Sequence, residues 1–270
     1  CAFARQHVTV ALTGDGGDEL FAGYDPFRAL TLARNYQRLV PGGIHRWIAA
    51  LVGRIPLSDR NMSLDFKLRR TLRGLNHPPS MWNPVWMAPL SVDEIADLFE
   101  TPVEPEELYA DAISLWNSCE SNDLIDRTSE FFTRLYLQDD ILTKSDRASM
   151  LESLELRAPF LDNDLVAFAQ RLPARFKYRN GTTKYLLRKA VEGDLPKDIV
   201  ARPKKGFGIP LSTWLRDLPA PELAPGKLPL NETWLADRWD EHRNREKDWR
   251  HALWCWMTLR ESAARAMRST

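Results

Sequence analysis

The pattern of hydrophobic and polar positions predicts a chain built mostly from helices. Apolar residues recur every three or four positions over residues 28–76, 123–150 and 246–267, as on the buried face of an amphipathic helix. Pro41-Gly42-Gly43 and Pro56 should break the first of these segments, because proline lacks the amide hydrogen that a helix interior needs. We therefore expect several helices of ordinary length and few strands.

Four shorter segments complete this pattern. Ser91-Val92-Asp93-Glu94 is a helix N-cap signature, and residues 183–192 predict a short helix. Residues 77–90 carry four prolines and two tryptophans, which favours an ordered loop packed by aromatic rings. Residues 218–231 are rich in proline and show little periodicity, so we expect a surface linker.

One segment near the start of the chain predicts a strand, a glycine-rich turn and the beginning of a helix. Residues 7–12 carry apolar, largely β-branched side chains at alternate positions, which predicts a buried core strand. No other stretch predicts a strand as convincingly. Glycines and carboxylates dominate the turn that follows: Thr13, Gly14, Asp15, Gly16, Gly17, Asp18 and Glu19.

This turn has the residue types of a nucleotide site. Ligands bind at the carboxyl ends of the strands in open α/β sheets, and backbone N–H groups of glycines at a helix N-terminus favour phosphate. Carboxylates repel bare phosphate, but Mg²⁺ lying between the two would bind both and offset the repulsion. Glycines and acids also form ordinary surface turns, which is the alternative interpretation.

The run LTGDGGDELFAGY, residues 12–24, resembles the second nucleotide-site motif in the synthetase domain of the asparagine synthetase family. Further segments resemble motifs of the same family and follow in its order: residues 144–162, 183–190, 195–199 and 202–210. Together these segments lie within residues 7–217. The resemblance therefore rests on several motifs and not on one turn.

The resemblance implies an α/β fold of the adenine-nucleotide α-hydrolase-like class, that of the PP-loop ATP pyrophosphatases. The domain would be incomplete at its N-terminus in this sequence, and therefore helix-rich and mostly α. Residues 1–217 would form the C-terminal part of the synthetase domain. Residues 218–270 would add a proline-rich linker and the C-terminal helix of the same domain.

Two parts of the family pattern do not occur in these 270 residues. The pyrophosphate loop SGGxDS is missing, and so is the glutaminase domain. In that domain the nucleophilic cysteine is followed by glycine. Cys1 is followed by alanine, so we do not expect it to be catalytic. A single parallel strand would also leave its ladder hydrogen bonds unsatisfied. We therefore expect the C-terminal part of a longer synthetase, with the glutaminase and PP-loop segments as its partners and a homo-oligomer as an open possibility.

The reaction that the resemblance implies is ATP-dependent amidation of aspartate to asparagine. The aspartate carboxylate would attack the α-phosphorus of ATP to give β-aspartyl-AMP and pyrophosphate. Ammonia, released from glutamine by a domain outside this chain, would then displace AMP. ATP and Mg²⁺ are the implied cofactors, because charge on phosphorus and on the departing pyrophosphate must be neutralised. We expect this chain alone to be inactive.

The resemblance also implies roles for the turn residues. Asp18 would hold Mg²⁺, and Glu19 would either share that role or order the turn. Asp15 lies where family members carry an acid that is important for forming the intermediate. The backbone of the turn would contact the nucleotide, at Thr13, Gly14, Gly16 and Gly17.

Lys204 is the expected catalytic cation, because an ammonium is a compact charge suited to phosphate oxygens. Lys205 is its rival, since the motif fixes the register only to about one residue, and a solvated basic pair is the alternative interpretation. Arg188 is expected to be structural.

Five further residues are candidates for the same site. Asp140, Lys144 and Arg147 are four and three residues apart and share one face of the longest predicted helix. The resemblance places that face beside the nucleotide, whereas the spacing alone equally suits a solvated ion-pair stripe. Glu155 is a candidate catalytic residue and Arg157 a candidate nucleotide contact, although Arg157 could instead be an anchor bonded to Glu155.

Composition narrows the class of protein further. Lys plus Arg and Asp plus Glu are equal at 37 each, so no overall field points to nucleic acid or a membrane surface. No apolar run reaches the roughly 18 residues of a membrane helix. The three cysteines form no CxxC pair and no signal peptide is recognisable, which predicts a cytoplasmic location.

Two other interpretations stay open. A relative of the β-lactam synthetase or lasso-peptide cyclase type uses the same adenylation for ring closure, although Asp15 disfavours the β-lactam branch, in which a tyrosine is usual. A non-catalytic fragment that packs against a partner is the third possibility. The missing pyrophosphate loop supports it, and the presence of Asp18, Arg157 and Lys204 argues against it.

Overall fold

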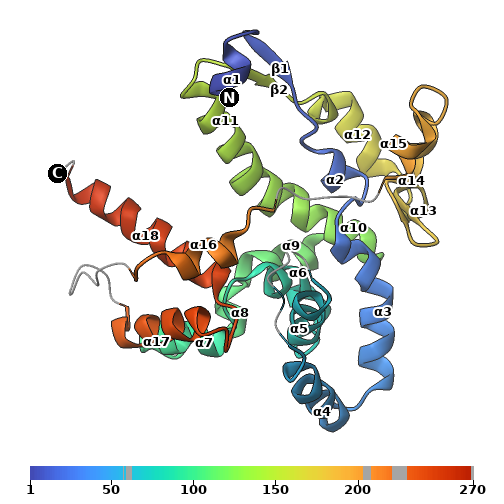
Figure 1. Ribbon diagram of the computed structural model, residues 1–270. Coiled ribbons are helices and arrows are strands. Elements are labelled where there is room, and N and C mark those ends of the chain that lie inside the picture. Colours follow the sequence, from blue (N-terminus) through green and yellow to red (C-terminus); the bar gives the residue numbers. More distant parts are fainter. Residues whose placement is uncertain (57, 59–62, 203–207, 221–229, 269–270) are drawn as a thin grey trace. The chain divides into compact units, whose positions relative to one another are not determined.

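The computed structural model describes residues 1–56, 58, 63–202, 208–220 and 230–268 (Figure 1). Contacts divide the chain into two compact units. Unit 1 comprises Cys1–Arg38 and Asp111–Lys205, and unit 2 comprises Leu39–Ala110 and Gly206–Thr270. The expected boundary at residue 217 within one domain stays a prediction.

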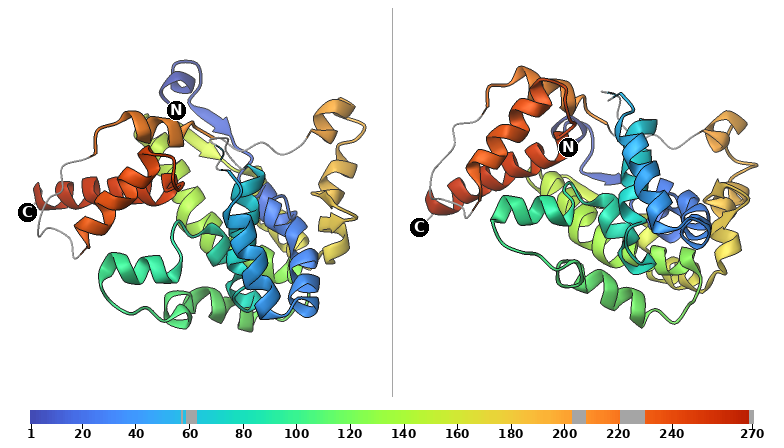
Figure 2. Two further views of the ribbon diagram at one scale, coloured as in Figure 1. Left: turned by 60° about the horizontal axis from the view of Figure 1, so that its bottom comes forward. Right: turned by 90° about the horizontal axis from the view of Figure 1, so that it is seen from below.

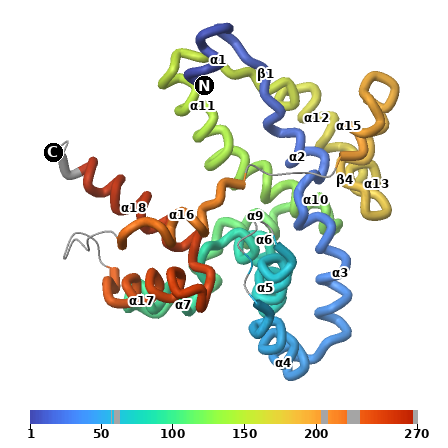
Figure 3. The backbone as a smooth tube through the Cα atoms, in the orientation of Figure 1, coloured from blue at the N-terminus to red at the C-terminus, as the bar shows by residue number. Residues whose placement is uncertain are grey.

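Unit 1 combines helices with two short strand pairs, and Figure 3 follows its backbone from the N-terminus. Its elements are α1 Ala2–Arg5, β1 Val10–Leu12, α2 Gly17–Leu20, α3 Asp25–Leu39, α9 Ala110–Ser118, α10 Leu124–Phe131, the π-helix Phe132–Leu142, α11 Thr143–Met150, β2 Glu155–Arg157, the 3₁₀ turn Pro159–Leu161, α12 Asn163–Arg171, α13 Ala174–Lys177, β3 Tyr178–Arg179, β4 Thr182–Thr183, α14 Tyr185–Ala190 and α15 Lys197–Ala201.

The strand expected at residues 7–12 is present but shorter, and it is not a buried core strand. β1 pairs in parallel with β2, a strand that the sequence did not predict, with Val10 opposite Glu155 and Leu12 opposite Arg157. Leu12 is 73% exposed. The ladder has only two strands among the described residues, so few side chains are available to cover β1.

The segment 123–150 is helical, as predicted, but its winding changes along its length. α10 leads into the π-helix Phe132–Leu142, which leads into α11. Phe132 and Leu137 are buried in the π-helix. π-helical turns are frequently found at functional sites, and they change which side chains share a face.

The helix expected over residues 183–192 is present as α14, and a β-hairpin precedes it. β3 and β4 pair antiparallel, and Asn180 and Gly181 between them have φ angles of 50° and 80°. Two residues with positive φ are the requirement of a type I′ hairpin turn, which Asn-Gly meets well. The Asn-Gly pair thus forms the turn of this hairpin.

Unit 2 is built from helices among its described residues. They are α4 Gly42–Gly53, α5 Leu64–Gly74, α6 Pro79–Met87, α7 Val92–Phe99, α8 Pro105–Leu108, α16 Leu211–Asp217, α17 Glu232–Arg243 and α18 Arg250–Arg268. Helices α16, α17 and α18 contact one another (Figure 2). Their apolar side chains form one core, which includes Leu215, Leu235, Trp239, Leu253 and Trp256.

Three expectations for unit 2 have clear outcomes. The Ser91 side chain caps α7 in a capping box with Glu94, as predicted. The loop expected at residues 77–90 was wrong, because α6 occupies most of it; Pro79 lies in the first turn, where proline is tolerated. The final helix predicted over residues 246–267 is confirmed as α18. The linker expected at 218–231 lies largely outside the described residues.

Candidate nucleotide site

The glycine–acid turn begins where β1 ends. The amide of Thr13 donates to the carbonyl of Arg157 at 2.8 Å, so the parallel ladder extends one residue into the turn. The Thr13 hydroxyl donates to Oδ2 of Asp15 at 3.0 Å. Gly14 is exposed, with nothing within 4 Å of the position that a Cβ would take. A ligand can therefore approach the backbone at Gly14.

The other two glycines of the turn are needed for packing. Gly16 has a φ of 91°, and a Cβ there would lie 2.4 Å from Cδ2 of Leu161. A Cβ on Gly17 would lie 3.2 Å from the ring of Phe160. The segment 159–161 thus packs directly on the turn, and two motifs that are far apart in the sequence meet here.

Asp18 is held by a lysine from the segment 183–190. Its Oδ1 atom lies 2.9 Å from Nζ of Lys184. The amide of Lys184 also donates to the carbonyl of Phe21 at 3.0 Å, and Lys184 has a φ of 54°, which is uncommon for a residue with a side chain. Sequence reasoning missed Lys184, although its place in a motif of the family was a usable signal.

Gly23 makes room for this ion pair. A Cβ at Gly23 would lie 1.9 Å from Oδ1 of Asp18 and 2.4 Å from Cε of Lys184. The amide of Gly23 donates to the carbonyl of Asp18 at 2.7 Å. A third glycine of the run LTGDGGDELFAGY, outside the turn itself, therefore also has a close steric role.

Glu19 is buried and accepts a hydrogen bond from the hydroxyl of Tyr24. Burial, followed by the bond to Glu19, raises the pKa of Tyr24 far above its usual range, so this hydroxyl stays protonated and donates. The Tyr24 ring packs on Phe132 of the π-helix, with centroids 4.7 Å apart. Through Tyr24, these contacts connect Glu19 of the turn to the π-helix.

The π-helix brings a second tyrosine and an acid toward the turn. Tyr136 packs edge-on against Tyr24, with centroids 5.8 Å apart. The pKa of Tyr136 is raised by burial, then by the charges of Asp140, Glu19 and Asp18. Asp140 therefore belongs to the electrostatic surroundings of the turn, although its own side chain is exposed.

Lys144 and Arg147 lie farther along the same helix. Both side chains are exposed in α11. No ion pair in the described part of the chain joins them to each other or to Asp140. The alternative of an ion-pair stripe gains no support from these contacts, and a nucleotide-facing role stays a prediction.

Glu155 and Arg157 lie on β2, beside the turn. Arg157 Nε donates to Oε1 of Glu155 at 2.8 Å, so the anchor contact foreseen for this pair is present. Both side chains are more than half exposed. Because β1 and β2 are parallel, their carboxyl ends meet at one edge, and Arg157 lies at the same edge as the turn.

Arg188 has the structural role that was predicted. Its Nε atom donates to the carbonyl of Thr183 at 3.0 Å, and its other nitrogens donate to the carbonyls of Val200 and Arg202. These bonds tie α14 to the segment that leads into residue 203. Lys204 and Lys205 themselves lie outside the described residues.

The described residues contain no group of three or more His, Cys, Asp and Glu side chains placed to hold a metal ion. They also contain no helix long and apolar enough to cross a bilayer.

Comparisons with known proteins identify the family. The model of the asparagine synthase family matches residues 1–265. This chain therefore belongs to the asparagine synthase family.

Individual relatives agree. The chain is 33% identical to asparagine synthetase (glutamine-hydrolyzing) 1 of Bacillus subtilis over 215 residues, which is 79% of this chain and 33% of that protein. It is 26% identical to asparagine synthetase (glutamine-hydrolyzing) 3 of the same organism over 207 residues, 77% of this chain and 27% of that protein.

Over a shorter stretch of 85 residues, the chain is 39% identical to asparagine synthetase (glutamine-hydrolyzing) of Gallus gallus, covering 30% of this chain and 15% of that protein. The chain thus spans about a third or less of the length of these relatives. No solved structure matches it significantly.

Proposed function

We propose that this chain forms the part of a glutamine-dependent asparagine synthetase in which the nucleotide binds and aspartate is activated. One observation carries the proposal: the glycine–acid turn lies at the carboxyl end of a parallel strand pair, with the backbone of Gly14 open and Asp18 held in place by Lys184. Membership of the asparagine synthase family supports it.

The proposed reaction has two steps. A carboxylate oxygen of the aspartate side chain attacks the α-phosphorus of ATP, the bond to the bridging oxygen breaks, and pyrophosphate leaves from β-aspartyl-AMP. Ammonia then attacks the acyl carbon, AMP leaves, and the nitrogen loses a proton to give the amide of asparagine. The ammonia comes from glutamine, hydrolysed elsewhere in the longer protein.

The turn supplies the nucleotide contacts in this proposal. The backbone at Thr13 and Gly14 faces the nucleotide, and Gly16 and Gly17 let the turn pack tightly on residues 159–161. Asp15, bonded to the Thr13 hydroxyl, lies within the same turn and helps to form the intermediate.

Asp18 is a suitable ligand for Mg²⁺. Magnesium in nucleotide sites is commonly bound by one or two carboxylates, with phosphate oxygens and water completing the shell. When bound, Mg²⁺ neutralises charge on the phosphates. Lys184 orients Asp18, and Glu19, bonded to Tyr24, orders the turn.

Positive charge comes from several residues. Lys204 would stabilise the charge that grows on the α-phosphate, and Arg188 fixes the carbonyls of residues 200 and 202 that precede it. Arg157 would contact the nucleotide from the neighbouring strand, with Glu155 orienting its guanidinium. Lys144 and Arg147 would contribute to the field along α11.

Product analysis of the longer protein tests the proposal. With aspartate, ATP, Mg²⁺ and either glutamine or ammonia, we expect equal amounts of AMP, pyrophosphate and asparagine. The 270-residue chain alone should release no AMP, because it lacks the SGGxDS loop. Formation of ADP, or of an amide other than asparagine, by the longer protein would refute the proposal. We expect the protein in the cytoplasm.

A further inference from the structure

Unit 2 contains a cavity of about 390 Å³ that is rich in arginine. Arg69, Arg70 and Arg73 line it from one face of α5, at spacings of one, three and four residues. Ala49 of α4 and Trp249 also line the cavity. The motifs that identify the nucleotide site contribute none of these side chains.

Among the described residues, the three guanidinium groups have carbonyl partners and no carboxylate partner. Arg69 donates to the carbonyls of Gly53 and Ile55, at 3.1 and 2.6 Å. Arg70 donates to the carbonyl of Trp86 at 2.7 Å, and Arg73 donates to those of Val85 and Ala88 at 2.7 and 2.6 Å. All three carbonyls lie at the C-terminal end of α6. No ion pair in the described part of the chain involves these arginines.

Donor groups are therefore in surplus. The buried Nε atoms of Arg69 and Arg73 have no hydrogen-bond partner among the described residues. A guanidinium has five N–H donors, and a buried donor without an acceptor destabilises its surroundings. A bound anion would supply such acceptors.

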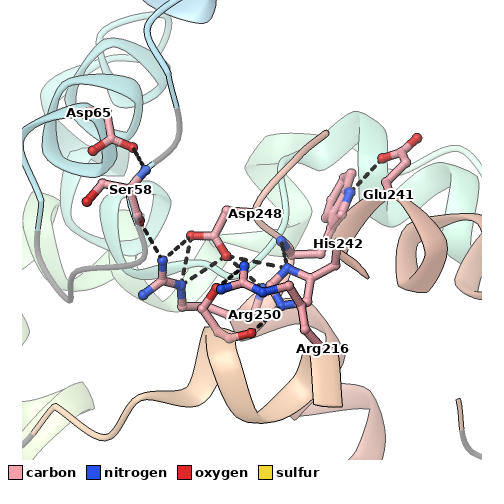
Figure 4. A network of polar contacts seen from close by, with 9 residues as sticks. Ser58, Asp65, Arg216, Glu241, His242, Asp248 and Arg250 are labelled. Atoms are coloured by element: carbon pink, nitrogen blue, oxygen red, sulfur yellow. Dashed lines mark hydrogen bonds and ion pairs between the residues drawn. The ribbon is translucent and has the colours of Figure 1, made fainter. Parts of the chain in front are cut away.

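The carboxylates that line the same cavity have other partners. Oδ2 of Asp248 lies 2.7 Å from Arg250, and Oε1 of Glu94 lies 2.8 Å from Nζ of Lys247. Asp65 accepts from the amide of Ser58 at 3.3 Å. Figure 4 shows Asp65 and Asp248 in these contacts. It also shows Arg250 donating a hydrogen bond to the carbonyl of Ser58.

Burial and neighbouring positive charge both act on the ionisable groups of the cavity, although Asp248 and Glu94 offset part of that charge. Burial, then the neighbouring charge of Arg73, lowers the pKa of Arg70 to about 10. Burial, then the charge of Arg70, lowers the pKa of His251 to about 4. An anion in the cavity would relieve both effects.

We propose that this cavity binds the phosphate group of a small molecule. Arginine forks match phosphate and carboxylate geometry. Phosphate is favoured because the surplus donors belong to more than one arginine, and a phosphate presents three or more acceptor oxygens where a carboxylate presents two. The volume suits a small metabolite and not a macromolecule.

Thermal unfolding of the 270-residue chain in inorganic phosphate tests this site, with sodium chloride or sodium acetate at the same ionic strength as references. We expect phosphate to raise the Tm by at least about 2 °C over both references, because a ligand that binds only the folded state stabilises it. An equal Tm in all three salts would overturn the proposal and leave the arginines as caps of α4 and α6.

Two variants locate the binding. Ala49→Glu places a carboxylate in the cavity, and it should abolish the phosphate effect without lowering the Tm in chloride. Ala50→Glu adds the same charge to an exposed neighbour outside the cavity, and it should keep the full effect. A phosphate effect that survives in Ala49→Glu would place the bound phosphate elsewhere and overturn the proposal.

An independent readout covers the case in which Ala49→Glu does not fold. In the unaltered chain, phosphate should shift the NMR cross-peaks of two arginine Nε–Hε groups, and Arg69→Lys and Arg73→Lys should each remove one of them. Phosphate titration that moves no arginine Nε peak would also overturn the proposal. Neither result depends on synthetase activity.

Discussion

Nζ of Lys184 lies 2.9 Å from Oδ1 of Asp18, and this ion pair joins the glycine–acid turn to the segment that follows the β3–β4 hairpin. The two residues are 166 positions apart in the sequence. Lys184 is additionally fixed by the hydrogen bond that its backbone N–H donates to the carbonyl of Phe21, and it has a positive φ. The orientation of Asp18 therefore depends on the hairpin and on α14.

Gly23→Ala should break this pair. The added methyl would lie 1.9 Å from Oδ1 of Asp18 and 2.4 Å from Cε of Lys184, so both side chains must shift from the positions in which they pair. We expect the adenylation rate of the longer protein to fall by about tenfold or more, since misplacing a positioning group strongly slows a reaction. Aspartate-dependent exchange between pyrophosphate and ATP measures that rate.

Gly14→Ala is the matched control for stability. Nothing lies within 4 Å of a Cβ at Gly14, so the Tm of Gly14→Ala should stay close to that of the unaltered chain, whereas that of Gly23→Ala should fall. Equal losses of Tm in the two variants would show that the crowding at Gly23 has no special importance.

Tyr24→Phe should destabilise unit 1. It leaves the buried carboxylate of Glu19 without the Tyr24 hydroxyl, and loss of one partner of a buried polar group destabilises a protein by about 1–3 kcal/mol. Urea unfolding of the chain measures this loss. Tyr185→Phe, which removes a hydroxyl in an exposed contact with Arg179, should change stability by less than about 0.5 kcal/mol.

If both tyrosine variants unfold alike, the Tyr24–Glu19 contact does not hold the turn. That result would favour the other role expected for Glu19, a share in holding Mg²⁺.

The sequence predicted local features of the chain better than its long-range contacts. The turn after residues 7–12 and the Ser91 cap could be predicted because each depends on a few adjacent residues. β2 could not be predicted from its pattern, because a three-residue strand carries almost no periodicity. The exposure of Leu12 could not be predicted either, since it depends on what covers the strand.

The partners of the turn were missed for the same reason. Nothing in the spacing of Asp18 and Lys184 indicates that they meet, because the contact depends on the packing of residues 159–161 and on the hairpin. The helix over 79–87 was missed because its prolines and tryptophans are also typical of a loop, and burial of Trp82 and Trp86 overrides that preference.

Lys204→Ala should lower the adenylation rate of the longer protein by two or more orders of magnitude, with a much smaller effect on ATP affinity. A lysine that meets charge growing at phosphorus stabilises the transition state by roughly 3–4 kcal/mol, by analogy with removed oxyanion donors. Lys204→Arg should rescue poorly, because a planar fork does not reproduce a compact charge.

Lys205→Ala is the control and should be mild. If Lys205→Ala is the crippling variant and Lys204→Ala is silent, the register of the motif is wrong by one residue. If both are silent, the two lysines are a solvated basic pair.

Unit 2 should lose stability in mild acid. Burial lowers the pKa of His242 and of His251, the latter to about 4, whereas histidine in an unfolded chain titrates near 6.5. The folded state thus binds fewer protons below about pH 6.5, so the stabilisation is complete above that pH and is lost as the pH falls toward 4. The free energy of unfolding in urea between pH 7.5 and 5 measures the slope.

His251→Gln should flatten that slope, and His7→Gln, at an exposed position, should leave it unchanged. Stability that is constant or rises as the pH falls from 6.5 to 5 would contradict the burial of these rings.

Asp18→Asn in the longer protein tests the central claim most directly, with pyrophosphate–ATP exchange and the free energy of unfolding measured on the same sample. The Asp18–Lys184 pair is partly exposed, at 21% and 28%, so its loss should lower stability by about 1 kcal/mol or less. Loss of a magnesium ligand should lower the Mg²⁺-dependent exchange rate by about 100-fold or more. Asp164→Asn, at an exposed position on α12, should change neither quantity. Unchanged exchange with a large fall in stability would show that Asp18 only shapes the turn, and would contradict the account.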